Sequence, residues 1–423
     1  SIEVFDIKGN KTVPAENDNR NQLNWMPKSD LLRYFAETDN GWSLLTLDPV
    51  SNDTRMVAGN LPKENFTFSP DEKMLYFSKK ETLGAKSPKG LKRILAPDDR
   101  QENYRNRYYI YQYQLETGLS QPLTFGQNTA YIRDITDDGR FILFSTQTED
   151  LSERPFSKNS LFRLDLQSMK TDTIWKDERF ASGATFSPDG SQLLITGGAE
   201  AFNSIGLNIN PGQIANSYDT QAFIMDIASK KIDPITKYFN PSINSTTWNK
   251  KDNLIYLRVE EKDCENMYSF NPKNKLFRKL PLKEELIRSF SVADKELIAA
   301  YAGSGTSNSR RAYLLDLKKM NSTLLADPYD EKLSKMTLGE VKDWNFVSNA
   351  GDTIQGRYYL PPHFDASKKY PLVVYFYGGT SPTQRTFETT YPLHVYAAND
   401  YVVYTLNPSG TTGFGQEFAA RHV

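Results

Sequence analysis

Several serine, histidine and acidic residues could act in nucleophilic catalysis, but no complete G-x-S-x-G motif places a serine between a strand and a helix. The nearest match is Gly379-Thr380-Ser381-Pro382-Thr383, with Asp400 and His422 following in the chain order of a serine triad. The residue after the nucleophile must donate a main-chain N–H to the oxyanion, and Pro382 has none. Spacings of about 20 residues also leave no room for the elements that separate triad members. We therefore reject Ser381 as a nucleophile.

The other candidate side chains have ordinary explanations. A second near miss, Gly305-Thr306-Ser307-Asn308-Ser309, lies inside a β-rich repeat, where we expect a turn. His363 follows two prolines in a loop, and His394 lies in a predicted helix; we expect both to be ordinary polar residues. The lone Cys264 excludes an internal disulfide and a cysteine-based metal site. No acidic or histidine ligand cluster is visible, so we expect neither a metal nor another cofactor.

The strongest structural signal is the apolar run Tyr370–Tyr377, which two glycines end abruptly. This run predicts a strand over 371–377 that is buried on both faces, as in the middle of a parallel sheet. Gly378 and Gly379 allow a sharp turn at its carboxyl end, where open α/β sheets place their ligands.

The flanking sequence predicts the rest of an α/β unit. Residues 344–347 and 353–360 are separated by a turn cluster and are typical of a hairpin. A helix is expected over 391–399, with Leu393, Tyr396 and Ala397 on one face, and a second buried strand over 401–406. Strand, helix and parallel strand form one crossover. The loop 407–415 then lies on the same sheet edge as the two glycines, and 416–423 predicts the first turns of a helix.

The first three quarters of the chain contain a repeated pattern, a short strand, a tight turn and a more apolar strand. The copies begin near Trp25, Phe66, Asp134, Ala184, Thr247 and Phe290. Most are followed by an aromatic strand, often ending in aspartate, as at 109–113, 161–166, 222–227 and 312–317. Such a four-stranded unit, recurring about every 45 to 60 residues, is typical of a β-propeller blade. About six units are visible, and residues 2–11 match half of another, so seven and eight blades both remain open.

Composition narrows the class of partner. The net charge of −1 gives no reason to expect nucleic acid or an anionic membrane surface. No segment approaches the roughly 18 to 20 apolar residues of a membrane span. The first residues lack the pattern of a signal peptide, so we expect any such peptide to have been removed. Two long stretches, 83–106 and 197–218, interrupt the repeats; each is expected to be either functional or a solvated surface loop.

These features together resemble the prolyl oligopeptidase family of serine peptidases, in particular its dipeptidyl-peptidase-like branch. The resemblance is carried by the propeller repeats, the hairpin before the α/β unit, Tyr-Gly-Gly-Thr at 377–380, and Asn-Pro-Ser-Gly-Thr-Thr-Gly-Phe-Gly-Gln-Glu-Phe at 407–418. It implies that the Tyr377 hydroxyl stabilises the oxyanion, although an aromatic that merely closes the sheet edge is the alternative. It also implies that the triad lies beyond Val423, so we expect no hydrolysis by this chain alone.

On the substrate side, the branch uses propeller carboxylates to hold a free amino terminus through charge-assisted hydrogen bonds. Glu200, in the 197–218 insertion, is the candidate for this role; Glu260-Glu261 is a paired alternative, or a solvated strand end. The double-acid arm usual in the family is not visible, so dipeptidyl release and oligopeptide or acyl-peptide cleavage stay open.

The sequence therefore predicts a mainly β protein with a seven- or eight-bladed β-propeller over 1–335 and the first part of an α/β-hydrolase domain over 336–423. The predicted function is the N-terminal portion of a serine exopeptidase acting on short peptides. The alternative is a non-catalytic propeller that binds peptides or proteins and carries a degenerate hydrolase domain. The resemblance favours a periplasmic or secreted location, and a homodimer is a further possibility.

Overall fold

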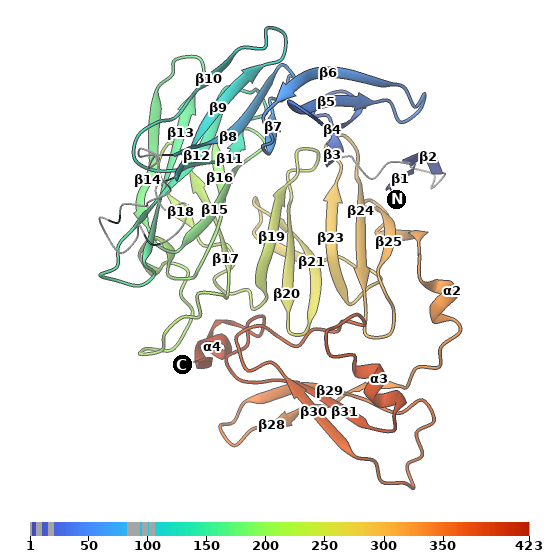
Figure 1. Cartoon of the computed structure of the whole chain (residues 1–423). Helices are drawn as coiled ribbons and strands as arrows, with labels where there is room; N and C mark the ends of the chain where they lie inside the picture. The colour runs from blue at the N-terminus through green and yellow to red at the C-terminus, as the bar shows by residue number, and fades with distance from the viewer. Residues whose placement is uncertain are drawn as a thin grey trace. The chain divides into compact units, whose positions relative to one another are not determined.

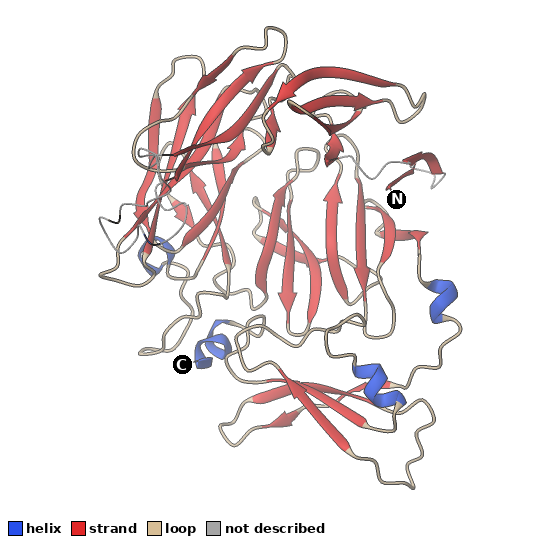
Figure 2. Ribbon diagram, in the orientation of Figure 1, coloured by secondary structure: helices blue, strands red, loops and turns tan. Residues whose placement is uncertain are grey.

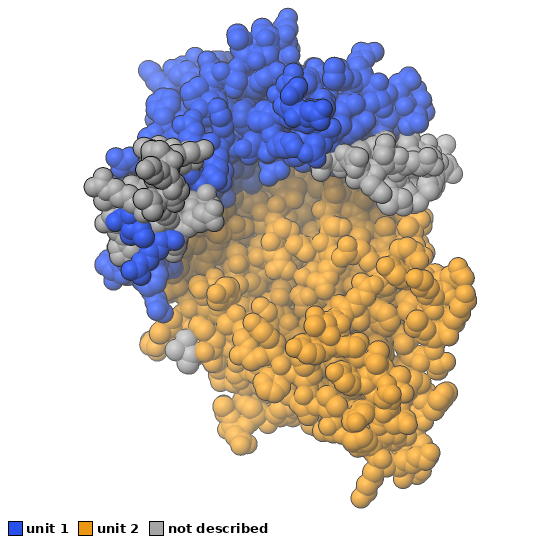
Figure 3. All heavy atoms as spheres, in the orientation of Figure 1, with its two compact units in different colours: residues 1–179, 184–191 blue, residues 180–183, 192–423 orange. Residues whose placement is uncertain are grey.

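The computed structural model describes residues 2–5, 11–15, 21–82, 94, 100 and 106–422. It divides into two compact units, residues 1–179 with 184–191, and residues 180–183 with 192–423 (Figure 3). The opening strands β1 (Ile2–Phe5) and β2 (Lys11–Ala15) pair with each other, while most of the predicted 83–106 interruption lies outside the described residues. No described helix is long and apolar enough to cross a membrane.

The first repeats form three antiparallel four-stranded sheets, each made of strands consecutive in sequence (Figure 1). The first contains β3 (Asn21–Trp25), β4 (Leu32–Thr38), β5 (Gly41–Leu47) and β6 (Thr54–Leu61). The second contains β7 (Phe66–Phe68), β8 (Met74–Thr82), β9 (Asn106–Gln114) and β10 (Ser120–Pro122). The third contains β11 (Ala130–Ile135), β12 (Phe141–Glu149), β13 (Ser157–Asp165) and β14 (Thr171–Glu178).

The remaining repeats form a fourth sheet of four strands and one sheet of eight strands, in which two four-stranded units join through a parallel pairing of β21 with β23. The fourth contains β15 (Ala181–Phe186), β16 (Gln192–Gly197), β17 (Gln221–Asp226) and β18 (Ile232–Asp233). The fifth unit contains β19 (Ser242–Trp248), β20 (Ile255–Glu261), β21 (Cys264–Asn271) and β22 (Leu276–Lys279). The sixth contains β23 (Leu286–Val292), β24 (Ile298–Ser304), β25 (Arg311–Asp316) and β26 (Asn321–Ala326).

The turn chemistry of the repeat explains this regularity. In the fourth unit the Ser187 hydroxyl donates to Asp189 Oδ1 at 2.6 Å, and Gly190 has φ +70°. The Asp189 carboxylate also accepts the N–H of Ser191, at 3.0 Å. These hydrogen bonds hold the pKa of Asp189 below its ordinary value. The same bond joins Ser69 to Asp71 in the second unit, so each copy closes a hairpin by the same local means.

After β26 and the short helix α2 (Asp330–Leu333) the chain enters a five-stranded mixed sheet (Figure 2). Its strands are β27 (Val341–Asp343), β28 (Phe346–Val347), β29 (Thr353–Tyr359), β30 (Leu372–Phe376) and β31 (Val402–Asn407). The helix α3 (Leu393–Ala398) lies between β30 and β31 in the sequence, and α4 (Gln416–Ala419) and a 3₁₀ turn (Ala420–His422) follow β31. β28 pairs with β29 as the predicted hairpin, and β30 runs parallel to β31 from Leu372↔Val402 to Phe376↔Leu406. The predicted crossover is thus present.

Two details of the prediction are wrong. The strand expected to be buried on both faces lies at the end of the strand order β27-β29-β31-β30. Leu372, Val374 and Phe376 are exposed, and only its alternate residues face the core with Leu393 and Ala397 of α3. Tyr396, expected on the buried helix face, is also exposed. An uninterrupted apolar run cannot reveal whether both faces of its strand are covered. The predicted domain boundary at 335/336 stays a prediction.

Candidate functional site

Tyr377 is the first residue after β30, where the chain turns away from the sheet. Its side chain is 53% exposed, and its hydroxyl has no hydrogen-bond partner among the described residues. The ring folds back over Gly379, because a Cβ atom there would lie 2.5 Å from Tyr377 Cε1 and 2.9 Å from Tyr377 Oη. The glycine therefore makes room for the ring. A phenol whose O–H is uncommitted can donate to a negative charge that develops beside the loop.

A fully buried arginine forms hydrogen bonds to the carboxyl-terminal part of the 377–385 loop. Arg357 of β29 is 1% exposed, and its Nη1 lies 2.9 Å from Asp263 Oδ2. The same guanidinium donates to the carbonyl oxygens of Thr383, at 3.0 Å, and Gln384, at 2.6 Å. Its Nε donates to the Tyr359 hydroxyl at 3.0 Å. One side chain thus joins the sheet, the β20–β21 turn and the 377–385 loop.

The 407–418 motif also forms hydrogen bonds to the 377–385 loop. Asn407 is fully buried at the end of β31, and its Oδ1 accepts the N–H of Thr383 at 2.7 Å. Thr412 donates its N–H to the Thr380 carbonyl at 2.8 Å. The two motifs singled out by the sequence are therefore brought into direct contact.

A second arginine extends the ion-pair network. Arg385 Nε lies 3.0 Å from Asp263 Oδ1, and its other nitrogens contact Glu285, at 3.1 Å, and Asp343, at 2.5 Å. Burial alone would lower the pKa of Arg385, but the Asp263 carboxylate and its neighbours raise it above its ordinary value. Asp263 is 1% exposed and lies between two guanidinium groups, so its charge is fully compensated.

A row of acidic side chains lies beside this network. Glu260 and Glu265 are directly opposite one another on β20 and β21, and Asp219 lies close to Glu260. Burial, with repulsion from Glu260, raises the pKa of Asp219 to about 7. Burial, with repulsion from Glu265, raises the pKa of Glu260 to about 7. Glu265 itself is paired with Arg288 at 3.0 Å and Arg258 at 3.4 Å.

The 197–218 insertion is anchored to the 407–418 motif and the helical turns that follow it. The main-chain N–H of Asn208 donates to Gln416 Oε1 at 2.9 Å. The buried Asn216 amide donates to the carbonyl oxygens of Gly410 and Ala419, at 3.2 and 3.3 Å. The insertion is therefore a structural arm rather than a freely solvated loop.

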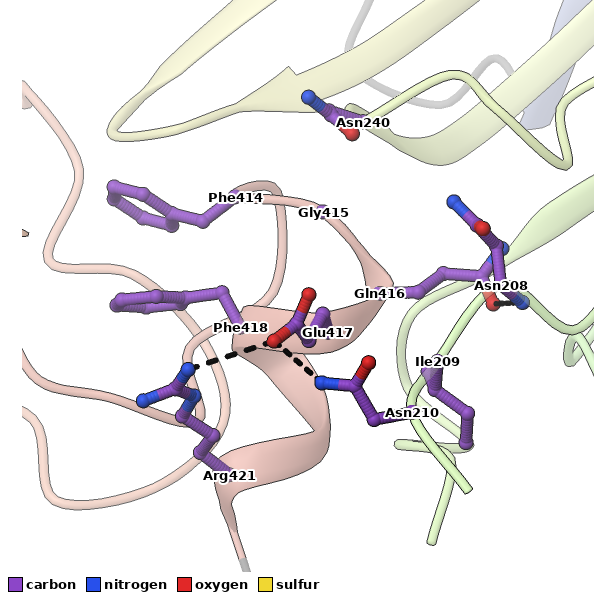
Figure 4. Close-up of a pocket in the computed structure, with 10 residues that line it drawn as sticks. All are labelled: Asn208, Ile209, Asn210, Asn240, Phe414, Gly415, Gln416, Glu417, Phe418 and Arg421. Carbon is purple, nitrogen blue, oxygen red and sulfur yellow. Dashed lines mark hydrogen bonds and ion pairs between the residues drawn. The ribbon is translucent and has the colours of Figure 1, made fainter. Parts of the chain in front are cut away.

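Between this arm and α4 lies a pocket of about 400 Å³ (Figure 4). Its wall is rich in carboxamides and carries two phenylalanine rings 4.9 Å apart. The lining residues are Asn208, Ile209, Asn210, Asn240, Phe414, Gly415, Gln416, Glu417, Phe418 and Arg421. Glu417 accepts a hydrogen bond from Asn210 at 2.7 Å and lies 3.6 Å from Arg421, so these two charges in the lining compensate each other.

Glu200 begins a strained turn in the same arm. After Ala201, the residues Phe202, Asn203 and Ser204 all have φ between +54° and +64°, a left-handed conformation that is unfavourable for residues other than glycine. The Glu200 carboxyl is partly buried, and burial raises its pKa above the ordinary value. No described side chain forms a hydrogen bond or ion pair with it. An unpaired, partly desolvated carboxyl is suited to binding a cation.

The two carboxyl groups of the alternative pair, Glu260 and Glu261, have different partners. Glu261 Oε2 lies 2.7 Å from Lys279 Nζ and also accepts from Asn266, at 2.7 Å, while its other oxygen accepts from Tyr268, at 2.8 Å. Glu260 Oε1 instead lies 2.5 Å from Thr412 Oγ1. Neither carboxylate is a solvated strand end.

The rejected triad is not assembled. Ser381, Asp400 and His422 are all exposed, and no hydrogen bond joins them in the described part of the chain. Ser309 is buried, and its hydroxyl donates to Glu388. His394 Nε2 lies 2.9 Å from the Thr306 carbonyl, and burial lowers the pKa of its imidazole. Among the described residues, no group of three or more histidine, cysteine, aspartate or glutamate side chains could hold a metal ion.

The chain therefore combines antiparallel four-stranded units with an α/β crossover, and Tyr-Gly-Gly follows the first strand of that crossover. No family model matches the chain. The Probable dipeptidyl-peptidase 5 of Aspergillus niger is 26% identical over 308 residues, covering 69% of this chain and 40% of that protein. Pyrococcus horikoshii acylaminoacyl peptidase has a similar fold, with TM-score 0.72, 14% identity and coverage of 99% of this chain and 62% of the other.

Porphyromonas gingivalis dipeptidyl peptidase 4 is also similar, with TM-score 0.60, 13% identity and coverage of 98% of this chain and 68% of that chain. At these identities the structural likeness establishes the fold alone. Taken with the sequence relatives, it confirms the resemblance of the chain to peptidases of the prolyl oligopeptidase family. It spans less than half the length of the Aspergillus relative.

Proposed function

We propose that this chain is the N-terminal portion of a serine peptidase that cleaves short peptides, with the preference of a dipeptidyl-peptidase-like exopeptidase. The six four-stranded units, together with β1 and β2, would form a propeller of seven or eight blades. The serine, aspartate and histidine of the triad would belong to sequence outside this chain. A periplasmic or secreted location is part of the proposal, and cell fractionation tests it.

The observation that carries the proposal is the Tyr377 loop. Its phenol is uncommitted, and its main chain is held at Thr383 and Gln384 by side chains, and at Thr380 by the Thr412 N–H. Catalysis of acyl transfer requires donors that are already in place when the oxyanion forms. In the proposed mechanism a serine attacks the peptide carbonyl, and the Tyr377 O–H donates to the oxygen that becomes negative.

Glu200 is the residue that we propose binds the amino terminus of the substrate. Its carboxylate would pair with the free α-ammonium group of the peptide and so fix the distance from the amino terminus to the bond that breaks. The strained turn after it is consistent with a side chain held for binding.

The test uses the full-length protein with fluorogenic dipeptide substrates. Tyr377→Phe is expected to lower kcat about 10²- to 10³-fold with little change in KM, as for removal of one oxyanion donor. Glu200→Gln is expected to raise KM for substrates with a free amino terminus and to leave N-acylated substrates unaffected. The chain by itself is expected to show no turnover. Wild-type kcat in Tyr377→Phe would refute the oxyanion role, and failure of the full-length protein to cleave any peptide would favour a peptide-binding protein.

A further inference from the structure

Glu260 lacks the compensating cation that its neighbours have. The opposite residue, Glu265, is paired with Arg258 and Arg288, and the adjacent Glu261 is paired with Lys279. Glu260 has no ion pair among the described residues. Like charges directly opposite each other on adjacent strands are destabilising. Because Glu265 has two arginine partners and Glu260 has none, Glu260 is the member of the cross-strand pair that favours the protonated form.

The other groups around Glu260 act in opposing directions. Asp219, on the chain just before β17, is 2% exposed, and neither of its carboxyl oxygens has a well-formed hydrogen bond. The Ser242 hydroxyl and the Gly413 N–H lower the pKa of Asp219, but burial outweighs them. Gln384 and Thr412 are uncharged, and their hydrogen bonds lower the pKa of Glu260, but burial outweighs them. No cation in the described part of the chain contacts Glu260, and two carboxyl groups face it.

The hydrogen bonds of Thr412 give a second, geometric indication. Its Oγ1 lies 2.5 Å from Glu260 Oε1 and 3.1 Å from the Thr380 carbonyl oxygen. A threonine hydroxyl has one hydrogen, and a carbonyl can only accept. Unless one hydrogen is shared between two acceptors, both contacts are full hydrogen bonds only when the Glu260 carboxyl carries a proton and donates it to Thr412 Oγ1. Thr412 then donates its own hydrogen to Thr380.

The contact is closely fitted. Gly413 has φ +81°, and a Cβ atom there would lie 2.9 Å from the Glu260 carbonyl oxygen. The Lys262 N–H donates to the Gly413 carbonyl at 2.9 Å. The 412–413 main chain therefore cannot move away from β20 without breaking hydrogen bonds, so Thr412 is held beside Glu260.

We propose that Glu260 is a positioning residue whose protonated carboxyl, through the Thr412 hydroxyl, fastens Thr380 and thereby the Tyr377 loop, and that loss of this proton loosens the loop. When Glu260 ionises, it must take the Thr412 hydrogen for itself, and the hydroxyl bond to Thr380 is lost. The main-chain bond from Thr412 to Thr380 remains, so the loop loosens without detaching. Since burial raises the pKa of Glu260 to about 7, the change falls near neutral pH.

Hydrogen exchange mass spectrometry on this chain tests the proposal, with protection corrected for the intrinsic exchange rate at each pH. In the wild type, protection of peptides covering 377–385 and the Thr412 N–H should fall about 3- to 10-fold between pH 6 and pH 8.5, the loss of one neutral hydrogen bond. Glu260→Gln should remove this fall, because its amide donates to Thr412 at every pH. Thr412→Val should show low protection at both pH values.

Glu261→Gln is the matched control, since the neighbouring carboxylate is paired with Lys279, and it should keep the wild-type profile. A wild type without the fall, or a Glu260→Gln variant that retains it, overturns the proposal. If Glu260→Gln does not fold, as judged by circular dichroism, the carbon-13 titration of the Glu260 carboxyl decides: an apparent pKa near 7 supports the proposal, and one near 4.5 overturns it. The inference rests on the proposed function only for the role of Tyr377; because no turnover is measured, the two can fail separately.

Discussion

Replacing Arg357 by methionine should destabilise the C-terminal part of the chain strongly. The guanidinium is 1% exposed and contacts Asp263 together with the carbonyl oxygens of Thr383 and Gln384. Methionine fills a similar volume but leaves these acceptors without their donor. Breaking a buried pair on one side costs about 3 to 5 kcal/mol. Arg385 still compensates Asp263, so we expect the lower half of this range.

Native-state hydrogen exchange measures the effect at the loop. A loss of about 3 kcal/mol corresponds to a fall of roughly 150-fold in the protection of peptides covering β29 and 377–385. Arg278→Met is the control, because Arg278 lies in β22 of the same compact unit and is exposed; it should change protection by less than about twofold. If Arg357→Met loses less than about 1 kcal/mol, or no more than the control, the view that this arginine holds the loop is refuted.

Three further outcomes follow from other contacts. Gly379→Ala should push the Tyr377 ring from its position, because the new Cβ would lie 2.5 Å from it; nuclear Overhauser contacts between ring and residue 379 should disappear while stability changes little. Asn216→Ala should cost about 2 to 3 kcal/mol, seen as faster exchange over 410–419, because two carbonyl oxygens lose their donor. The pKa of Asp219 is raised from 3.8 to about 7, so its stabilising effect is complete below pH 3.8 and is lost as pH rises towards 7. Asp219→Asn should therefore match the wild type near pH 4 and exceed it at pH 8 by on the order of 2 to 4 kcal/mol in urea unfolding; equal stability at pH 8 would contradict this.

Much of the fold could be predicted because its determinants are local. Each repeat is closed by a turn whose side chains bond to residues two to five positions away, as Ser69 does with Asp71 and with the Met74 N–H, so the pattern is visible within a dozen residues. The sequence also predicts the crossover from β30 to β31, because two apolar runs flank a stretch whose apolar residues recur with the period of a helix.

The contacts that hold the candidate site could not be predicted. Arg357 reaches Asp263 across 94 positions, and Thr412 reaches Glu260 across 152. Neither pair has a local signature, and a lone arginine in an apolar strand says only that some partner is needed. The exposure of Leu372 was hidden for a related reason, because side-chain type does not reveal whether a strand lies at a sheet edge.

The 377–385 loop is held largely through its peptide groups. Arg357, Asn407 and Thr412 bond to its carbonyl and N–H groups, which every amino acid at those positions would offer. The exposed Ser381 takes no part in these bonds. Replacing side chains such as that of Ser381 would therefore change the surface that a ligand contacts but not the main-chain path of the loop. Ligand selectivity at this loop could change without any change in the residues that hold it.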